Sequence, residues 1–355
     1  MIILIAFKKL QISKGLLACY SYLIISGILS VVLGTNHLKN VFAQVFGIMI
    51  CSIYFYNFYT YYNFKVVQIF KTYVYLSFGL AVIGYPLLIY NKLFGDGFLL
   101  HSILNEPAHY ATFVLPSFYY AFKDRQIPRY IWPVIFGSIL LSGSSLAIMG
   151  LMVAIVLMQN KIRPLRLILP VIISLVFVII LYNLYPDFKL RVDDTTKVLQ
   201  NKDLSGANLS TYALLSNMYV SAESFSNNPM LGSGLGSHEL SHDKYLGVID
   251  GIEEFEEYLN LNSKDAGSLF LRVLSDMGLI GIFAIVLFII KYRVHMNSQN
   301  LQSTFISRAI IIYFFCKLFR EGHYFSPEMY FFVLGYYFVK KYSEIQTELI
   351  IKHEQ

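Results

Sequence analysis

Runs of about 20 apolar residues recur along almost the whole chain, and each is long enough to cross the hydrocarbon core of a membrane as a helix. The chain has 355 residues, of which 56% are hydrophobic and only 14% are charged. Soluble domains carry about 25% charged residues, so a soluble core could not hide this much apolar surface. The sequence therefore predicts an all-α polytopic membrane protein.

Apolar runs bounded by charged and turn residues predict about ten transmembrane helices. They cover residues 16–34, 41–63, 72–91, 108–122, 130–145, 146–160, 165–186, 266–290, 304–319 and 325–340. Seven lie in residues 1–186, and three lie in residues 265–355, which end in a short tail. Residues 187–264 form one large polar segment between these two groups. A polytopic protein with a single large polar segment usually has its polar chemistry there.

The placement of basic residues predicts the orientation of the chain. With the N-terminus in the cytoplasm, the cytoplasmic segments hold 17 lysines and arginines. These are Lys8, Lys9, Lys14, Lys65, Lys71, Lys123, Arg125, Arg129, Lys161, Arg163, Arg166, Lys291, Arg293, Arg308, Lys340, Lys341 and Lys352. The short outer loops hold four, which are Lys39, Lys92, Lys317 and Arg320. We therefore predict that both termini are cytoplasmic and that the polar segment is an extracytoplasmic loop. This charge pattern reflects membrane topology and not nucleic-acid binding.

The fifth and sixth predicted spans are short and meet at the turn Leu141-Ser-Gly-Ser-Ser145. The alternative is one continuous helix of about 43 Å at 1.5 Å per residue. That helix would move Lys161, Arg163 and Arg166 outside and the polar segment inside, against the basic-residue count. We therefore predict a helical hairpin.

Within the polar segment, residues 209–225 have apolar side chains at helical spacing. This pattern predicts an amphipathic helix that lies on the membrane or packs over the spans. Asn228-Pro229 should end the helix, and Gly232-Ser-Gly-Leu-Gly236 should form a turn. Backbone N–H groups in such a turn can bind phosphate oxygens, although a plain loop has the same composition.

The segment His238-Glu-Leu-Ser-His242 matches the H-E-x-x-H pattern of zinc proteases. Glycine precedes it and Gly247 follows it, so barely two turns of helix fit there. Only the carboxylates of residues 253–257 offer a third ligand, and a solvated helix face is the simpler interpretation of that run. The three cysteines all lie in apolar runs and provide no disulfide or metal framework. We therefore predict no metal site.

Ionisable residues within or beside a span need a partner or water. Arg272 lies about two turns into an apolar run, so it should pair either with an anionic ligand or with Asp276, four residues on. Lys317 and Arg320 either snorkel to lipid headgroups or belong to a site. We expect the segment before residue 108, the polar loop and residues 317–323 to converge on one side of the membrane.

Four motifs follow one another along the chain. They are Asn105-Glu-Pro-Ala-His-Tyr-Ala111, Ser142-Gly-Ser-Ser-Leu-Ala147, Asn228-Pro-Met-Leu-Gly-Ser-Gly-Leu-Gly236 and Leu271-Arg-Val-Leu-Ser-Asp-Met-Gly-Leu-Ile-Gly281. In order and layout they resemble the O-antigen polymerase and O-antigen ligase family. The third resembles the N-P-x-x-G-x-G signature of its outer loop, and the fourth its L-x-x-L-x-E-x-G-L-I-G helix, with Asp276 at the acidic position. The resemblance covers roughly residues 90–340.

The resemblance implies a GT-C-like glycosyltransferase in the bacterial cytoplasmic membrane. Such an enzyme transfers a glycan from undecaprenyl pyrophosphate to an acceptor hydroxyl, with inversion and without a metal or another cofactor. The product would be a surface polysaccharide such as O-antigen or capsule. The expected partners are the undecaprenyl-pyrophosphate-linked glycan, membrane lipid and possible companions, namely a chain-length regulator and a flippase.

On this resemblance we predict which residues carry the site. The pyrophosphate contacts are Arg272, Arg320 and Arg191, with Gly234 and Gly236 as further substrate-binding residues. The candidates for the base, or for orienting the acceptor, are His242, His238, Glu106 and His323. Two departures leave the base unassigned: Ser263-Lys-Asp265 stands where many relatives have His-Asn, and Ser144-Ser145 lacks an arginine often found there.

Other functions remain open at this stage. A ligase shares the architecture and differs from a polymerase in its acceptor. A flippase for the same lipid-linked glycan would favour charges at the bilayer midplane and paired halves, which the sequence does not show. A zinc protease remains the remotest alternative.

Overall fold

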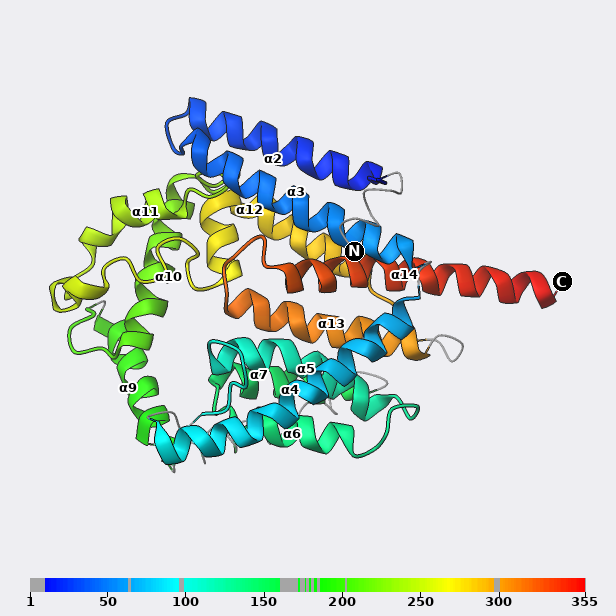
Figure 1. The fold of residues 1–355 in the computed structure, drawn as a ribbon. Coiled ribbons are helices and arrows are strands. Elements are labelled where there is room, and N and C mark those ends of the chain that lie inside the picture. Colours follow the sequence, from blue (N-terminus) through cyan, green and yellow to red (C-terminus); the bar gives the residue numbers. More distant parts are fainter. Residues whose placement is uncertain are drawn as a thin grey trace.

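The computed structural model describes residues 10–62, 65–95, 99–159, 186–201, 203–296 and 301–354, together with residues 172, 176, 179, 182 and 183. Within this part of the chain the fold is entirely helical, apart from one isolated bridge between Asp203 and Asp250. Figure 1 shows a bundle of long helices with a smaller helical lobe at one end. The predicted all-α fold is confirmed.

Within the described residues, the N-terminal half of the bundle has six helices. They are α2 (Lys14–Val32), α3 (Leu38–Tyr61), α4 (Val66–Phe94), α5 (Pro107–Lys123), α6 (Ile131–Leu141) and α7 (Ser145–Met158). Their starts follow local capping rules. The Ser13 side chain accepts a hydrogen bond from the Leu16 N–H at the start of α2, and Pro107 occupies the first turn of α5, where a missing N–H costs nothing.

The polar segment forms the lobe, and three further helices complete the bundle. The lobe contains α9 (Pro186–Asn201), α10 (Leu209–Asn227), α11 (His238–Tyr245) and the short 3₁₀ helices η1 (Leu246–Val248) and η2 (Ile252–Tyr258). The bundle then continues with α12 (Leu269–Lys291), α13 (Leu301–Phe319) and α14 (Pro327–Glu354). The predicted helix at 209–225 is therefore confirmed, and Asn228 ends it as expected.

Five described helices are long and apolar enough to cross a membrane, namely α2, α3, α4, α12 and α13. Helices α6 and α7 are apolar but shorter. The predicted spans at the positions of α5 and α14 are also helices, whereas the predicted span 165–186 falls largely outside the described residues. The chain is a multi-pass membrane protein.

Helices α6 and α7 form the predicted hairpin. The Tyr110 hydroxyl of α5 donates to Ser138 Oγ of α6 at 2.6 Å, while Phe122, at the other end of α5, packs against Trp132, so α5 and α6 are antiparallel. The Tyr119 hydroxyl donates to the Leu157 carbonyl of α7 at 3.0 Å, and Gly150 lies against Leu115, so α7 runs parallel to α5. The two short helices are therefore antiparallel to each other, joined at Gly143 with φ +56°.

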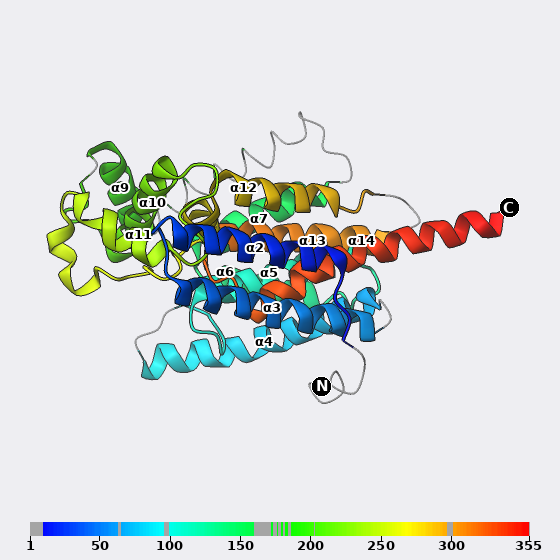
Figure 2. The same cartoon turned by 90° about the horizontal axis from the view of Figure 1, so that it is seen from above.

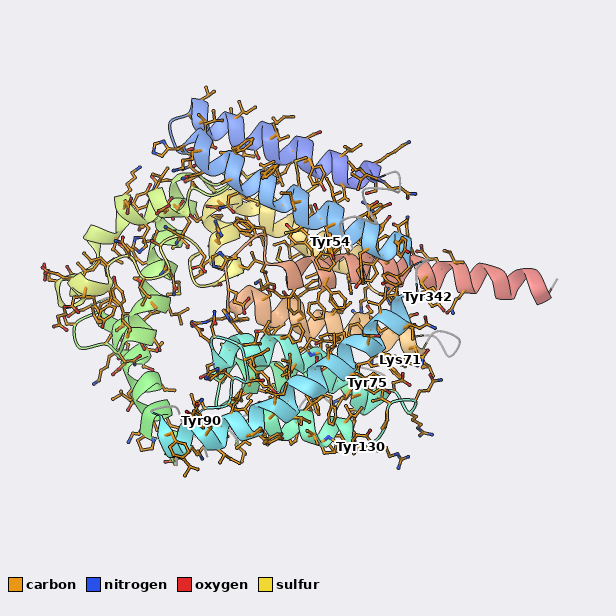
Figure 3. The ribbon with its side chains drawn as sticks, viewed as in Figure 1. Tyr54, Lys71, Tyr75, Tyr90, Tyr130 and Tyr342 are labelled. Carbon is orange, nitrogen blue, oxygen red and sulfur yellow. The ribbon has the colours of Figure 1, made fainter. Side chains whose placement is uncertain are left out.

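The lobe lies at one end of the bundle, and the start of α2 and the end of α14 lie towards the other end (Figure 2). Lys71 and Tyr90 mark these ends on α4, Lys71 towards the start of α2 and Tyr90 towards the lobe (Figure 3). We call them the termini end and the lobe end. The lobe has a small core of its own, in which the rings of Tyr212 and Phe255 stack with centroids 4.2 Å apart. Burial of such aromatic faces stabilises the lobe as a folded unit and not as a loose loop.

Candidate functional site

The glycine-rich loop of the third motif is locked into a break in α12. Gly278 has φ +58° and ψ −150°, which interrupts the helix and leaves neighbouring backbone groups without helical partners. The loop supplies them: the N–H groups of Ser233 and Gly234 donate to the carbonyls of Ser275 and Asp276, both at 2.9 Å. In the other direction, the Leu279 N–H donates to the Pro229 carbonyl at 2.9 Å. The motif therefore joins the lobe to the bundle.

Asp276 is the centre of this junction. Its carboxylate accepts hydrogen bonds from the Gly236 N–H at 2.8 Å, the Tyr324 hydroxyl at 3.1 Å and the Ser237 hydroxyl at 3.2 Å. Arg272 Nε lies 3.5 Å from the same carboxylate. One buried charge thus connects the loop, α12 and the segment before α14, and the energy of such a group depends on every partner being present.

Arg272 is buried and contacts protein groups of the junction. It is 2% exposed, it donates to the Gly322 carbonyl at 2.9 Å, and its guanidinium lies 4.4 Å from the centre of the Tyr324 ring. The pairing with Asp276, one of the two alternatives drawn from the sequence, is the arrangement that the structure shows. A direct contact of Arg272 with pyrophosphate stays a prediction.

The predicted phosphate-binding glycines are part of the same junction. The Gly234 N–H donates to the Asp276 carbonyl, and the Gly236 N–H donates to the Asp276 side chain. Both glycines have positive φ, +105° and +82°, and a Cβ on Gly234 would lie 2.1 Å from Ser30 Oγ. Glycine is needed here for close packing, and the role of these two residues in binding substrate stays a prediction.

His238 and His242 lie inside the lobe. They are 0% and 1% exposed, and His238 Nε2 lies 3.0 Å from Asn217 Oδ1 of α10. Burial lowers the pKa of His238 to about 3, with smaller contributions from His242 and Arg272, and burial also lowers the pKa of His242. Both rings are therefore neutral at pH 7 and closed off from an acceptor.

The literal H-E-x-x-H pattern lies on the eight-residue helix α11, as short as the flanking glycines predict. The three residues of the pattern do not share one environment. His238 and His242 are buried, whereas Glu239 lines an open pocket. A zinc protease needs them around one ion.

Ion pairs bring together two of the three segments that we expected to converge. Arg320 donates to Glu106 Oε2 at 3.0 Å, and both side chains are nearly half exposed. His109 Nε2 lies 3.1 Å from Glu321. The start of α5 and the end of α13 therefore meet at the lobe end of the bundle, with an accessible guanidinium between them.

Lys317 does not snorkel to headgroups, so that alternative is wrong. Its side chain is 1% exposed and its Nζ donates to Glu321 at 2.6 Å and to Ser326 at 3.0 Å, with Glu328 at 3.6 Å. Two carboxylates offset the cost of burying the ammonium group. The i,i+4 spacing of Lys317 and Glu321 was visible in the sequence and is the signal that could have indicated this pair.

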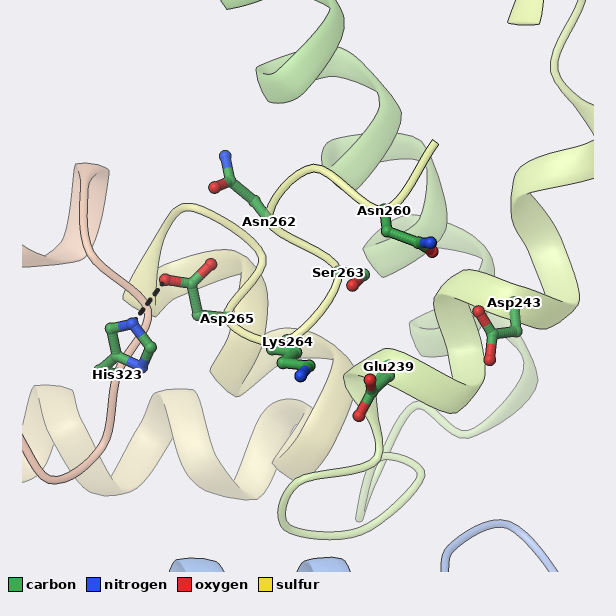
Figure 4. Close-up of a pocket in the computed structure, with 8 residues that line it drawn as sticks. All are labelled: Glu239, Asp243, Asn260, Asn262, Ser263, Lys264, Asp265 and His323. Carbon is green, nitrogen blue, oxygen red and sulfur yellow. Dashed lines mark ion pairs between the residues drawn. The ribbon is translucent and has the colours of Figure 1, made fainter. Parts of the chain in front are cut away.

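His323 is the accessible histidine of this cluster. Its side chain is 56% exposed, and its Nε2 lies 3.1 Å from Asp265 Oδ2. The pair stands at one edge of an open polar pocket of about 730 Å³ (Figure 4). The pocket is also lined by Glu239, Asp243, Asn260, Asn262, Ser263 and Lys264. Carboxylates, amides and a hydroxyl are groups that can hydrogen-bond to sugar hydroxyls.

A second cavity is an apolar groove of about 350 Å³. It runs between α2 and α3 on one side and α12, α13 and α14 on the other, and Lys317 is its one charged lining residue within the described chain. Leu269 and Tyr324 line the groove, whereas Asp265 and His323 line the pocket. The two cavities share no lining residue, and their linings come next to each other in sequence at His323 and Tyr324.

Arg191, another predicted site residue, belongs to α9. Its side chain is outside the part of the structure that is described. Sequence reasoning missed the role of Asp265, because folding alone brings it to its partner His323. Asp265 had been noted only as a departure from the family pattern.

The fold and these cavities define a multi-pass membrane protein with a polar site at one end of its bundle. Residues 133–286 match the family model described as O-Antigen ligase, which confirms the predicted resemblance. The matched stretch includes α6, α7, the lobe and most of α12. A comparison with curated proteins gives no match.

Proposed function

We propose that the protein is a membrane glycosyltransferase that polymerises undecaprenyl-pyrophosphate-linked repeat units into a surface polysaccharide. The family match supports membrane glycan processing of this general type. The single observation that carries the finer proposal is that successive residues, His323 and Tyr324, line a polar pocket and an apolar groove. A lipid-linked glycan has the same two parts, a sugar chain and an apolar carrier, joined by a charged group.

In this arrangement His323 acts as the general base. Its Nε2 faces Asp265, so its Nδ1 is the nitrogen that takes the proton of the acceptor hydroxyl. The acceptor oxygen then forms a bond to the anomeric carbon of the donor as the bond from that carbon to the pyrophosphate oxygen breaks. Asp265 orients the imidazole and stabilises the imidazolium that forms. The other predicted candidates, His238, His242 and Glu106, act by supporting the lobe or Arg320.

Arg320 is the cation proposed for the departing pyrophosphate. Its guanidinium is partly exposed and is held by Glu106 at one nitrogen, so its remaining donors can approach a phosphate. Lys317 adds a positive charge where the groove meets the charged cluster. Because pyrophosphate is a good leaving group, positioned cations and one base are sufficient catalytic groups. The predicted contacts of Arg272, Arg191, Gly234 and Gly236 remain part of this proposal.

The proposal includes the predicted topology. Ten spans of a GT-C-like arrangement, with both termini cytoplasmic, would put the lobe end on the outer face of the cytoplasmic membrane. Residues 1–186 and 265–355 would then form the membrane part, and residues 187–264 would form the extracytoplasmic part. A flippase would deliver the substrate, and a chain-length regulator would be a further partner.

An O-antigen ligase is the second candidate, because the matched family model carries that description. The two functions separate in a reaction of the purified protein with one substrate, the polyprenyl-pyrophosphate-linked repeat unit. A polymerase produces a ladder of longer lipid-linked glycans and free polyprenyl pyrophosphate. A ligase produces none until a different lipid acceptor is added. Absence of both products with authentic substrates would refute the proposed function.

A further inference from the structure

A further cavity opens at the termini end of the bundle, away from the lobe. It has a volume of about 680 Å³ and lies between α2, α3, α12 and α14. Figure 2 shows these helices side by side on the way to the end where α2 begins and α14 ends. We call it the termini-end cavity. It joins the apolar groove, because Cys19, Ile48, Phe288, Tyr330 and Val333 line both.

The mouth of the termini-end cavity is positively charged. Lys14, Lys291 and Lys341 line it, from three different helices, and none of its described lining residues is a carboxylate. Two of the ammonium groups lie against aromatic rings: Lys291 Nζ is 5.4 Å from the ring centre of Tyr292, and Lys341 Nζ is 4.9 Å from that of Tyr337. A ring face attracts a cation without neutralising it.

The three lysines have no ion-pair partner among the described residues. The neighbouring Lys340, in contrast, pairs with Glu344 at 3.3 Å on the same helix. Among the described ion pairs none includes Lys14, Lys291 or Lys341. Three like charges around one opening repel one another, so a bound anion would stabilise them.

Beyond the lysines the cavity becomes apolar and open to the side. Cys19, Leu334 and Val333 line its deeper part, and the adjoining surface of α12 exposes Phe283, Leu287 and Ile290. In a membrane this surface faces lipid. The ligand that fits both parts has an anionic head and a long apolar tail.

We propose that the termini-end cavity binds an anionic phospholipid, with its headgroup phosphate on Lys14, Lys291 and Lys341 and an acyl chain along the apolar lining of the same cavity and the exposed face of α12. Free phosphate would leave the apolar part uncovered. A zwitterionic phospholipid would bring a cation to a site that already holds three. The phospholipid would leave the apolar groove to the proposed glycan carrier, so this inference does not depend on the proposed function.

The test is native mass spectrometry of the purified protein released from nanodiscs that contain equal amounts of phosphatidylglycerol and phosphatidylcholine. The wild-type protein should retain phosphatidylglycerol in preference to phosphatidylcholine. Each lysine near an anionic lipid contributes about a fivefold increase in affinity, so the K14Q/K291Q/K341Q variant should bind about a hundredfold more weakly. The matched control K340Q should retain phosphatidylglycerol like the wild type.

Two further measurements complete the test of lipid binding. The K14R/K291R/K341R variant keeps the charges and should restore retention, which separates lost binding from lost folding. Inorganic phosphate at millimolar concentration should not displace the lipid, because it lacks the tail. Equal retention of both lipids by the wild type, unchanged retention by the glutamine variant, or displacement by phosphate would each overturn the proposal.

Discussion

Replacing Asp276 with alanine should detach the glycine-rich loop from α12. The substitution leaves Arg272 charged and buried without its carboxylate, and breaking a buried pair in this way costs about 3–5 kcal/mol. It also removes the acceptor of the Gly236 N–H, of Ser237 and of Tyr324. These terms overlap, so we take about 4 kcal/mol for the whole change, a large part of the stability of a typical domain.

Hydrogen–deuterium exchange of the amides in residues 229–237 measures this loss directly. A change of about 4 kcal/mol corresponds to roughly a thousandfold faster exchange through local opening. The control is Glu256→Ala, which removes an exposed carboxylate elsewhere in the lobe and should leave these amides unchanged. Wild-type protection in the Asp276→Ala variant would refute the idea that this carboxylate holds the junction together.

A double variant separates the structural role of Arg272 from a role in binding substrate. Replacing Arg272 with methionine and Asp276 with leucine removes both charges, and such exchanges of a buried pair are often neutral for stability. We expect protection of the loop to return. If polymerisation returns as well, Arg272 is structural. If it stays absent in a stable protein, Arg272 contacts the pyrophosphate, as the sequence predicted.

The remaining predictions concern the base, the cation and the lobe. His323→Gln should lower turnover about 10²–10⁴-fold without changing the thermal midpoint, and Asp265→Asn should lower turnover less. The exposed control His37→Gln should be active. A fully active His323→Gln variant would exclude His323 as the general base. Arg320→Gln should lower kcat/KM about 10²-fold in the same steady-state assay, and Arg320→Lys should lower kcat/KM less. Equal activity of the wild type and both variants would exclude the contact of Arg320 with pyrophosphate. The folded-state pKa of His238, about 3, lies below the ordinary 6.5, so the unfolded state binds more protons and stability falls as pH drops from 6.5 towards 3. The loss at pH 5 should be about 2 kcal/mol, seen as a lower thermal midpoint that is absent in His238→Asn; identical pH profiles of the two proteins would contradict it.

Much of the helical layout could be predicted from apolar runs alone. The hairpin of α6 and α7 was predicted because Ser142, Gly143 and Ser144 interrupt an apolar run and because the basic residues favoured it. The break in α12 could not be predicted, since Gly278 within an apolar run usually indicates close helix packing. Its positive φ is stable only because a loop some 45 residues earlier supplies the missing hydrogen bonds.

The site was predicted less completely, for a physical reason. Chemical type identifies residues that can act, but burial and partners decide which of them are accessible. His238 and His323 look equally suitable in the sequence, and folding buries the first within the lobe and leaves the second at the edge of a pocket. Arg272 and Arg320 differ in the same way, because Arg272 is buried and Arg320 is partly exposed. Lys317 was misjudged because its two carboxylate partners lie beyond the end of its helix.

The most direct test of the central claim is a cryo-electron microscopy map of the protein with a polyprenyl-pyrophosphate-linked repeat unit bound. We predict pyrophosphate density beside Arg320 at the level of His323 and Tyr324, sugar density in the polar pocket and carrier density in the apolar groove. Pyrophosphate density at Lys14, Lys291 and Lys341, or sugar density away from Asp265 and His323, would contradict the account.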